Sequence, residues 1–170
     1  MKEFQKIDPK EMPGNAIQRI GDDWMLITTK RGEEINTMTA NWGGMGFLWH
    51  KPVVFLFVRP QRYTREFLDA GEEFTLSFYD RSFRPQMTLC GKQSGRDINK
   101  VEACHFTPRM FENAPAFEEA ETVIACRKLF CQVQTEENFL DPSLLTSFYP
   151  DKDYHHFYVA EITGVYVEKK

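Results

Sequence analysis

A basic turn followed by a short helix has the residue types of an anion-binding site. Arg59 and Arg62 come just before Thr64, and Thr64 is placed to cap a predicted helix. The first N–H groups of a helix lack partners and the helix dipole adds positive potential there, so phosphate groups bind well at such ends. An ordinary capped helix with surface arginines explains the same segment without a ligand.

A second cationic cluster follows about thirty residues later in the chain. Ser94 and Arg96 come shortly before Lys100. Ser94 or Asp97 can cap a helix that carries Lys100, which then lies one turn beyond Arg96 on the same face. Two cations beside a helix start again suit an anion. A solvated pair spaced by four residues remains an equal alternative.

Polar side chains interrupt an apolar, strand-like stretch between these features and the N-terminus. Asn is a poor strand former, so we expect the Asn36 amide to have a partner such as the edge of a heterocycle. Trp42 and Trp49 have rings that can stack against a flat ligand, although buried or interface tryptophans are the commoner case. The stretch comprises Asn36, Thr37, Met38, Thr39, Ala40, Asn41 and Trp42.

Histidines and cysteines show no pattern typical of catalysis or of metal binding. His155 and His156 are adjacent, and neighbours on a strand point to opposite faces, so only one of them can line a given site. The four cysteines fit no zinc spacing, and we expect no metal. A dinucleotide-binding GxGxxG starting at Gly44 would need glycine at position 49, which is Trp49. No GxSxG, HExxH or P-loop occurs, so no catalytic side chain is assigned.

The elements that must position these residues are mostly strands. Short turns join them, which favours an antiparallel barrel or sandwich. Gly43, Gly44 and Gly46 are interpreted as a glycine-rich bend, residues 1–22 as irregular, and residues 136–153 as a polar excursion. The strand at 74–79 is expected to point Phe74, Leu76 and Phe78 inward, and Thr75 and Ser77 outward. Predicted strands cover residues 24–29, 35–42, 52–59, 74–79, 122–135 and 155–168, and short helices 63–70, 83–90 and 98–104.

Composition limits the class of protein. A chain of 170 residues is expected to form one domain, residues 1–170. A formal net charge of −4 gives no overall basic field for nucleic acid, whereas basic residues concentrated between 59 and 100 suit a small anion. No run is apolar enough for a membrane span or signal peptide, so we expect a cytoplasmic protein without a membrane partner.

The ordered series of motifs resembles the flavin reductase-like family, in its flavoredoxin branch. The series comprises NTMTANWGG from Asn36, Lys51-Pro52, RPQRYT from Arg59, FTLSF from Phe74, Cys90-Gly91, and SGRD from Ser94 followed by Lys100. It runs from about Trp24 to Lys100 and continues more weakly to the C-terminus.

This resemblance implies a mainly β fold with a few short helices, an antiparallel, Greek-key-like split β-barrel. It also implies non-covalently bound FMN, usually at the interface of a homodimer. By family likeness, Asn36–Asn41 and Trp42 run along the isoalloxazine and ribityl chain, and Arg59, Arg62 and Thr64 lie near the phosphate. Ser94, Arg96 and Lys100 assist there. His155 or His156 approaches the flavin from the later part of the chain.

Two functional hypotheses follow from this resemblance. In the first, the protein is an FMN-dependent oxidoreductase that takes a hydride from NAD(P)H and passes electrons to a small-molecule or protein acceptor. In the second, it is a flavoredoxin-type electron carrier that holds FMN and exchanges electrons with a protein partner, without NAD(P)H turnover. A flavin-free barrel that binds another aromatic anion leaves the pattern at 36–64 unexplained.

Overall fold

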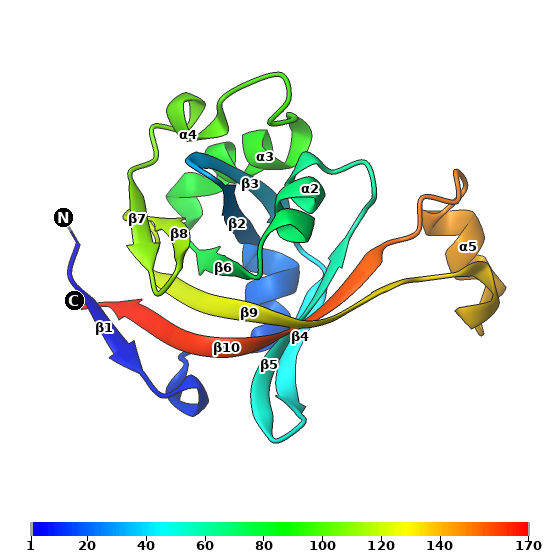
Figure 1. Ribbon diagram of the computed structural model, residues 1–170, viewed down its shortest axis with the longest axis horizontal. Helices are drawn as coiled ribbons and strands as arrows, with labels where there is room; N and C mark the ends of the chain where they lie inside the picture. The colour runs from blue at the N-terminus through cyan, green and yellow to red at the C-terminus, as the bar shows by residue number, and fades with distance from the viewer. Residues whose placement is uncertain (1, 170) are drawn as a thin grey trace.

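A single large antiparallel sheet organises the molecule, whose computed structural model describes residues 2–169. Neighbouring strands follow the order β3-β2-β6-β9-β10-β5-β4, and β1 pairs with the far end of β10. The curved sheet and the long pair β9–β10 are visible in Figure 1. The predicted mainly β, antiparallel barrel is confirmed. The strands are β1 (Phe4–Ile7), β2 (Met25–Arg31), β3 (Glu34–Ala40), β4 (Gly43–Leu48), β5 (Lys51–Val58), β6 (Glu73–Phe78), β9 (Thr122–Val133) and β10 (His156–Glu168).

Short helices and a small second sheet surround this frame. In Figure 1, α2, α3, α4 and the β7–β8 hairpin gather on one side of the main sheet, whereas α5 stands apart. Within residues 2–169, no helix is long and apolar enough to cross a membrane. These elements are α1 (Ala16–Gln18), α2 (Tyr63–Ala70), α3 (Arg84–Lys92), α4 (Lys100–Ala103), α5 (Pro142–Phe148), β7 (Pro108–Phe111) and β8 (Ala114–Phe117).

Both faces of the central strands are buried, which explains their apolar sequences. Ile27 of β2 and Ile124 of β9 belong to the cluster inside the barrel. Their neighbours Leu26 and Val123 belong to a second cluster, beneath α3 and the β7–β8 hairpin. Strands covered on both sides lose the alternation of apolar and polar residues. Each fully buried aliphatic side chain contributes roughly 1.5–3 kcal/mol to the hydrophobic stabilisation.

Thr75 and Ser77 point outward from the barrel, as predicted, but they do not reach solvent. Both side chains are fully buried because the second cluster covers the outer face of β6. Their hydroxyl groups find partners there: Thr75 Oγ1 donates to the Pro115 carbonyl at 2.6 Å, and Ser77 Oγ lies 2.9 Å from Tyr79 Oη. Alternation predicted which side chains are inward, but not the second layer.

The glycine-rich segment is a strand rather than a bend. Gly43, Gly44 and Gly46 lie in β4, which pairs with β5 along its whole length. Gly43 has φ +154°, and a Cβ atom there would lie 2.6 Å from the Phe55 carbonyl oxygen. Only glycine allows this close approach of the two backbones. The chain turns before Gly43, next to Trp42.

The segment predicted as irregular and the segment predicted as a polar excursion also carry regular structure. Residues 4–7 form β1, whose partner in β10 is more than 150 residues away in the chain, so no local pattern marks it. Residues 136–153 contain α5 at the tip of an arm, which we define as residues 129–156 and which includes the outer end of β9 (Figure 1). This arm brings His155 back to the barrel.

Candidate functional site

Eight of the residues predicted from sequence line one cavity of about 230 Å³, called the slot below. It lies where the end of β3, the turn before β4, the end of β5 and the start of β10 meet. Non-local segments therefore converge at the place predicted from their motifs. The slot is lined by Met38, Thr39, Ala40, Asn41, Trp42, Phe57, Arg59, Arg62 and His155.

The walls of the slot are partly apolar and partly aromatic. Met38 and Ala40 also belong to the barrel core, so they form a fixed floor. The Trp42 ring packs edge-on against Phe148 of α5 and lies 5.3 Å from the His155 ring. Trp42 remains 40% exposed, which leaves ring surface free for a ligand. A flat aromatic ring fits such surroundings.

Phe57 lines the slot but was not among the predicted residues. The run of residues 52–59 was interpreted as a strand buried on both faces, which gave Phe57 no special role. Yet residues i and i+2 share one face of a strand, so Phe57 must face the same way as Arg59. The prediction for Arg59 therefore contained the signal that identifies Phe57.

Asn36 and Thr37 do not line the slot. The Asn36 amide has a partner, as expected, but Nδ2 donates to Thr64 Oγ1 at 3.0 Å, within the chain. Thr37 Oγ1 is fully buried, 2.9 Å from Thr28 Oγ1 and 3.2 Å from the Ile27 carbonyl oxygen. Both side chains hold β3 against β2 and α2, which positions the slot without contacting its contents.

A smaller cavity of about 100 Å³, called the seat below, adjoins the slot through Arg62. It lies between the start of α2 and the loop after α3, and Thr64, Ser94 and Lys100 also line it. The predicted N-cap role of Thr64 is wrong, because α2 begins at Tyr63 and Arg62 occupies the cap position without a side-chain cap bond. The first N–H groups of α2 thus lack that side-chain partner.

Three cationic residues line the seat, and two of them, Arg62 and Lys100, already bind carbonyl groups at the end of α3. Arg62 donates to the carbonyls of Gly91 at 2.9 Å and Cys90 at 3.2 Å. Lys100 Nζ donates to the carbonyls of Cys90 and Thr37, both at 2.9 Å. Cations are favoured at the C-terminal end of a helix, and these two tie α3 to α2 and β3. Each side chain keeps further N–H groups for an anion.

Burial disfavours the charged forms of Arg62 and Lys100, so it lowers the pKa of both groups. Desolvation lowers the pKa of Arg62, and desolvation followed by the charge of Arg62 lowers the pKa of Lys100 to about 8. A bound anion offsets both effects because it favours the charged forms. The seat is therefore electrostatically suited to a phosphate.

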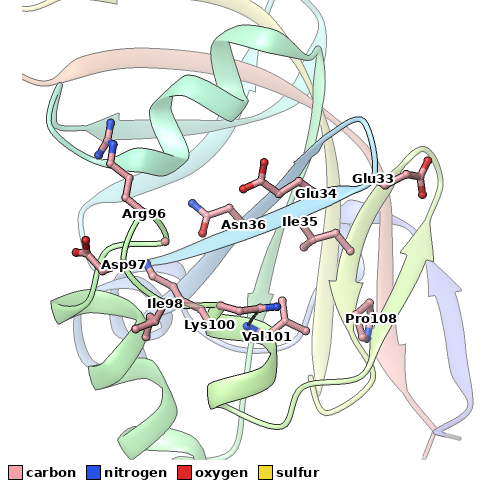
Figure 2. Close-up of a pocket in the computed structure, with 12 residues that line it drawn as sticks. Glu33, Glu34, Ile35, Asn36, Arg96, Asp97, Ile98, Lys100, Val101 and Pro108 are labelled. Carbon is pink, nitrogen blue, oxygen red and sulfur yellow. Dashed lines mark hydrogen bonds between the residues drawn. The ribbon is translucent and has the colours of Figure 1, made fainter.

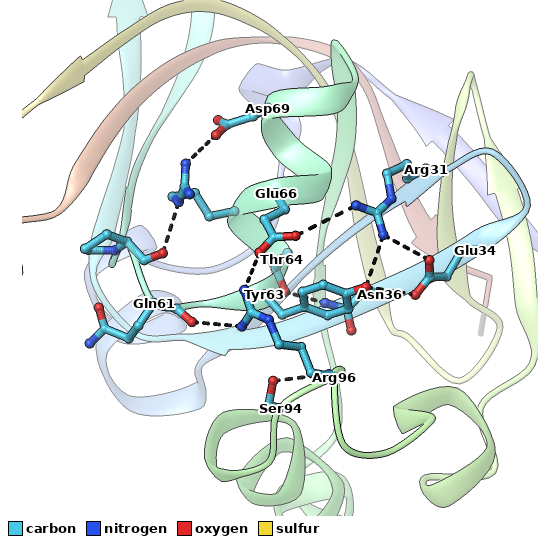
Figure 3. A network of polar contacts seen from close by, with 12 residues as sticks. Arg31, Glu34, Asn36, Gln61, Tyr63, Thr64, Glu66, Asp69, Ser94 and Arg96 are labelled. Carbon is cyan, nitrogen blue, oxygen red and sulfur yellow. Dashed lines mark hydrogen bonds and ion pairs between the residues drawn. The ribbon is translucent and has the colours of Figure 1, made fainter.

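Arg96 points away from the seat. Its guanidinium forms an ion pair with Glu66, donates to the Gln61 carbonyl and lies over the Tyr63 ring (Figure 3). Arg96 thereby fastens the loop after α3 to α2 from outside. Ser94 lines the seat, and its Oγ accepts from the Arg96 backbone N–H at 3.2 Å.

A larger cavity of about 480 Å³ lies on the other side of the loop, with Asn36, Arg96 and Lys100 on its wall (Figure 2). Glu33, Glu34 and Asp97 also line it, so its charges are mixed. The carboxylates make this cavity less suitable for an anion than the seat. The predicted residues thus divide between the slot, the seat and this outer wall.

His155, not His156, lines the slot. The imidazole is buried, and its Nδ1 lies 2.7 Å from Tyr149 Oη in the arm. Burial, and then the positive charge of Arg59, lower the pKa of His155 to about 4, so the ring is neutral near pH 7. His156 is the first residue of β10 and pairs with Val58. Alternation along the strand separates the two histidines, as predicted.

Arg59 joins the arm to the barrel beside the slot. Its guanidinium donates to Asp153 at 2.6 Å and to the Phe148 carbonyl at 2.8 Å, and lies 5.1 Å from the centre of the Tyr149 ring. Asp153 and the arm thus fix the side chain that was predicted near a phosphate. Among residues 2–169, no cluster of three or more possible metal ligands occurs.

The fold and the site together have the shape and the charges that suit a flat, anionic ligand. Comparison with known families agrees with this class: residues 17–170 match the model of the flavin reductase like domain. The chain therefore belongs to the flavin reductase-like family, and the family resemblance drawn from its motifs is confirmed. No curated protein matches the chain.

Solved structures share the fold at low sequence identity. An FMN-binding domain of a flavin reductases-like enzyme from Shewanella baltica has a TM-score of 0.72 and 16% identity, over 98% of this chain and 78% of that one. Flavoredoxin from Methanosarcina acetivorans has a TM-score of 0.68 and 19% identity, and the match covers 86% of this chain and 69% of that one. An FMN-binding protein from Thermus thermophilus, with bound p-hydroxybenzaldehyde, has a TM-score of 0.68 and 21% identity. That match covers 99% of this chain and 83% of the other.

Proposed function

We propose that this protein binds FMN non-covalently and is a flavoprotein oxidoreductase. The observation that carries the proposal is the pairing of an aromatic slot with a cationic seat through one shared side chain, Arg62. FMN has the matching parts, a flat ring and a phosphate that carries about −1.5 to −2 charges near neutral pH. The relatives described as FMN-binding support the same assignment.

The residues present suit the two parts of FMN. Met38, Ala40, Trp42 and Phe57 give the slot apolar and aromatic surface for the ring. Arg62, Thr64 and Lys100 line the seat, and the start of α2 supplies N–H groups for the phosphate. Bound flavin supplies the electron-transfer chemistry, whereas the protein binds it, orients it and limits its contact with water.

We propose NAD(P)H as the electron donor, with a small molecule or protein as the acceptor. The matched family model is described as a flavin reductase like domain, and a structure described as a flavoredoxin shares the fold of this chain. The alternative is therefore an FMN electron carrier without NAD(P)H turnover. His155 is neutral near pH 7, so it does not supply a general acid that would distinguish the two.

Anaerobic mixing with NADH or NADPH distinguishes the reductase from the carrier. We expect the visible absorption of the FMN-loaded protein to bleach within seconds with at least one nucleotide, because positioning the ring and donor together removes most of the entropic barrier. Dithionite serves as the control that shows the flavin is reducible. Bleaching by dithionite alone would favour the carrier.

We further propose that the protein is a homodimer that uses an aromatic face next to the slot. This face comprises Trp49, Phe55, Phe57, Phe130 and Phe157, from the tip of the β4–β5 hairpin and from strands β5, β9 and β10. Successive rings lie in contact range: Phe57 is 5.1 Å from Phe157, Phe157 is 6.3 Å from Phe130, and Phe130 is 6.3 Å from Trp49.

The aromatic face and the slot each point to a second copy. Trp49 is 53% exposed and Phe130 is 40% exposed, and contiguous exposed apolar surface marks an interaction site. Phe57 belongs to both the face and the slot, so a partner seated there borders the slot. At about 230 Å³ and 100 Å³, the slot and the seat together lie near the lower end of the roughly 300–1,000 Å³ of typical ligand pockets, and we propose that a second copy supplies a further wall of the slot.

A further inference from the structure

A buried chain of hydrogen bonds leads from the arm to the slot. His155 Nδ1 lies 2.7 Å from Tyr149 Oη, and Tyr149 Oη lies 3.2 Å from Gln134 Oε1. The backbone N–H of Gln134 also donates to the His155 carbonyl at 3.0 Å, which fixes the two ends of the chain relative to each other. None of these contacts was expected from sequence, because residues 134, 149 and 155 meet only through the fold of the arm.

The direction of these hydrogen bonds follows from the atoms involved. Gln134 Oε1 can only accept, so the single hydroxyl proton of Tyr149 is directed to it. The Tyr149 oxygen then accepts from Nδ1–H of His155. A neutral imidazole carries one N–H, so Nε2 is left without a proton. Burial raises the pKa of Tyr149 above its ordinary value, so its hydroxyl keeps its proton near pH 7.

The surroundings of His155 hold the ring in this neutral form. Burial is the largest cause that lowers the pKa of His155, and the positive charge of Arg59 lowers it further, while Asp153 has the opposite effect and His156 acts in the same sense as Arg59. The Tyr149 ring stands at 89° to the imidazole, and the centre of the Trp42 ring lies 5.3 Å from the centre of the imidazole. Among residues 2–169, no group hydrogen-bonds to Nε2, which leaves this nitrogen available to the slot.

We infer that Tyr149 and Gln134 are positioning residues that fix the tautomer of His155, so that an unprotonated Nε2 accepts a hydrogen bond from an N–H group of the ligand in the slot. The ligand's identity rests on the proposed function: the isoalloxazine ring carries an N–H on its pyrimidine side, and its reduced form carries more. An acceptor at this point selects a ring with an N–H edge over one with only carbonyl groups. The tautomer itself does not depend on the ligand.

Nitrogen-15 NMR of the ligand-free protein tests the assignment directly, because the long-range correlation pattern of an imidazole distinguishes its tautomers. The spectrum of His155→Gln identifies the signals of His155 among the four histidines. We expect the Nδ1–H form in the native protein. If the Nε2–H tautomer were observed instead, Gln134 would have to donate to Tyr149 and Tyr149 would have to donate to His155. That result would overturn the inference.

Two variants of Gln134 separate positioning from a merely structural role. Gln134→Leu removes the acceptor, so the Tyr149 proton is free to turn to Nδ1 and the Nε2–H tautomer becomes dominant. Gln134→Glu keeps an acceptor oxygen and retains the Nδ1–H form. An unchanged tautomer in Gln134→Leu, in a protein whose amide spectrum shows an intact fold, would also overturn the inference. Gln134 is half-buried, which makes both replacements sterically tolerable.

Flavin binding provides the second readout. Loss of one hydrogen bond changes affinity by about two- to tenfold, so we expect Gln134→Leu to weaken FMN by that factor and Gln134→Glu to weaken it less. Equal weakening by both variants would contradict the acceptor role of Nε2. Failure of the native protein to bind FMN, with the Nδ1–H tautomer present, would remove the proposed function and leave the positioning role intact.

Discussion

Replacing Arg62 and Thr64 with alanine is expected to weaken FMN binding by about 10- to 100-fold more than riboflavin binding. The two ligands share the ring and ribityl chain, and only FMN carries the phosphate. Hydrogen bonds to a charged group contribute roughly 1.5–3 kcal/mol, which corresponds to that range of affinity. Both side chains line the seat, and Arg62 also lines the slot. Fluorescence titration with each flavin measures the difference.

The matched control for this experiment is Arg96→Ala. It removes a positive charge from the same region, but the Arg96 guanidinium is engaged with Glu66 on the outside of α2 (Figure 3). We expect it to change both affinities by less than about threefold, the size of a surface ion pair's contribution. If the Arg62 and Thr64 double variant lost both flavins equally, the phosphate would not lie in the seat.

Replacing Phe130 with glutamate is expected to convert the protein from a dimer to a monomer. The charge would enter the centre of the aromatic face, where its desolvation costs several kcal/mol. Light scattering should therefore give twice the 20.0 kDa chain mass for the native protein and a single chain mass for the variant. In the proposed dimer a second copy would complete the slot, so FMN affinity should fall together with the dimer.

Ile17→Glu is the control for the interface, because Ile17 is 84% exposed in α1 and is not one of the residues of the aromatic face. It introduces the same charge on an apolar surface residue, and the dimer should persist. A native protein that elutes as a single chain, or a Phe130→Glu variant that remains a dimer, would contradict the proposed interface.

Sequence patterns predicted those elements of the fold that depend mainly on neighbouring residues in the chain. The alternation in β6 and the apolar run in β5 gave strands close to their observed bounds, and the helix predicted at residues 63–70 matches α2. Strand β4 was missed because glycine signals a turn in sequence. In the structure, Gly43 instead permits close contact with the Phe55 backbone.

The site was predictable to the extent that its residues lie in motifs. The stretch from Met38 to Trp42 lines the slot as one continuous strand end, so its residues were found together. Tyr149 was missed because its contacts with Gln134 and His155 depend on how the arm folds, and no local pattern encodes them. Arg96 was predicted to assist anion binding because of its spacing from Lys100. In the structure its charge is paired instead with Glu66 of α2, which is distant in the chain.

Titration of the purified protein with FMN, followed by visible absorption under native conditions, tests the central claim most directly. The slot and the seat predict that FMN copurifies with the protein or binds on addition, one per chain, with a shifted absorption band because the ring enters apolar surroundings. FMN that neither copurifies nor changes its spectrum on addition would contradict the assignment of this protein as an FMN-binding oxidoreductase.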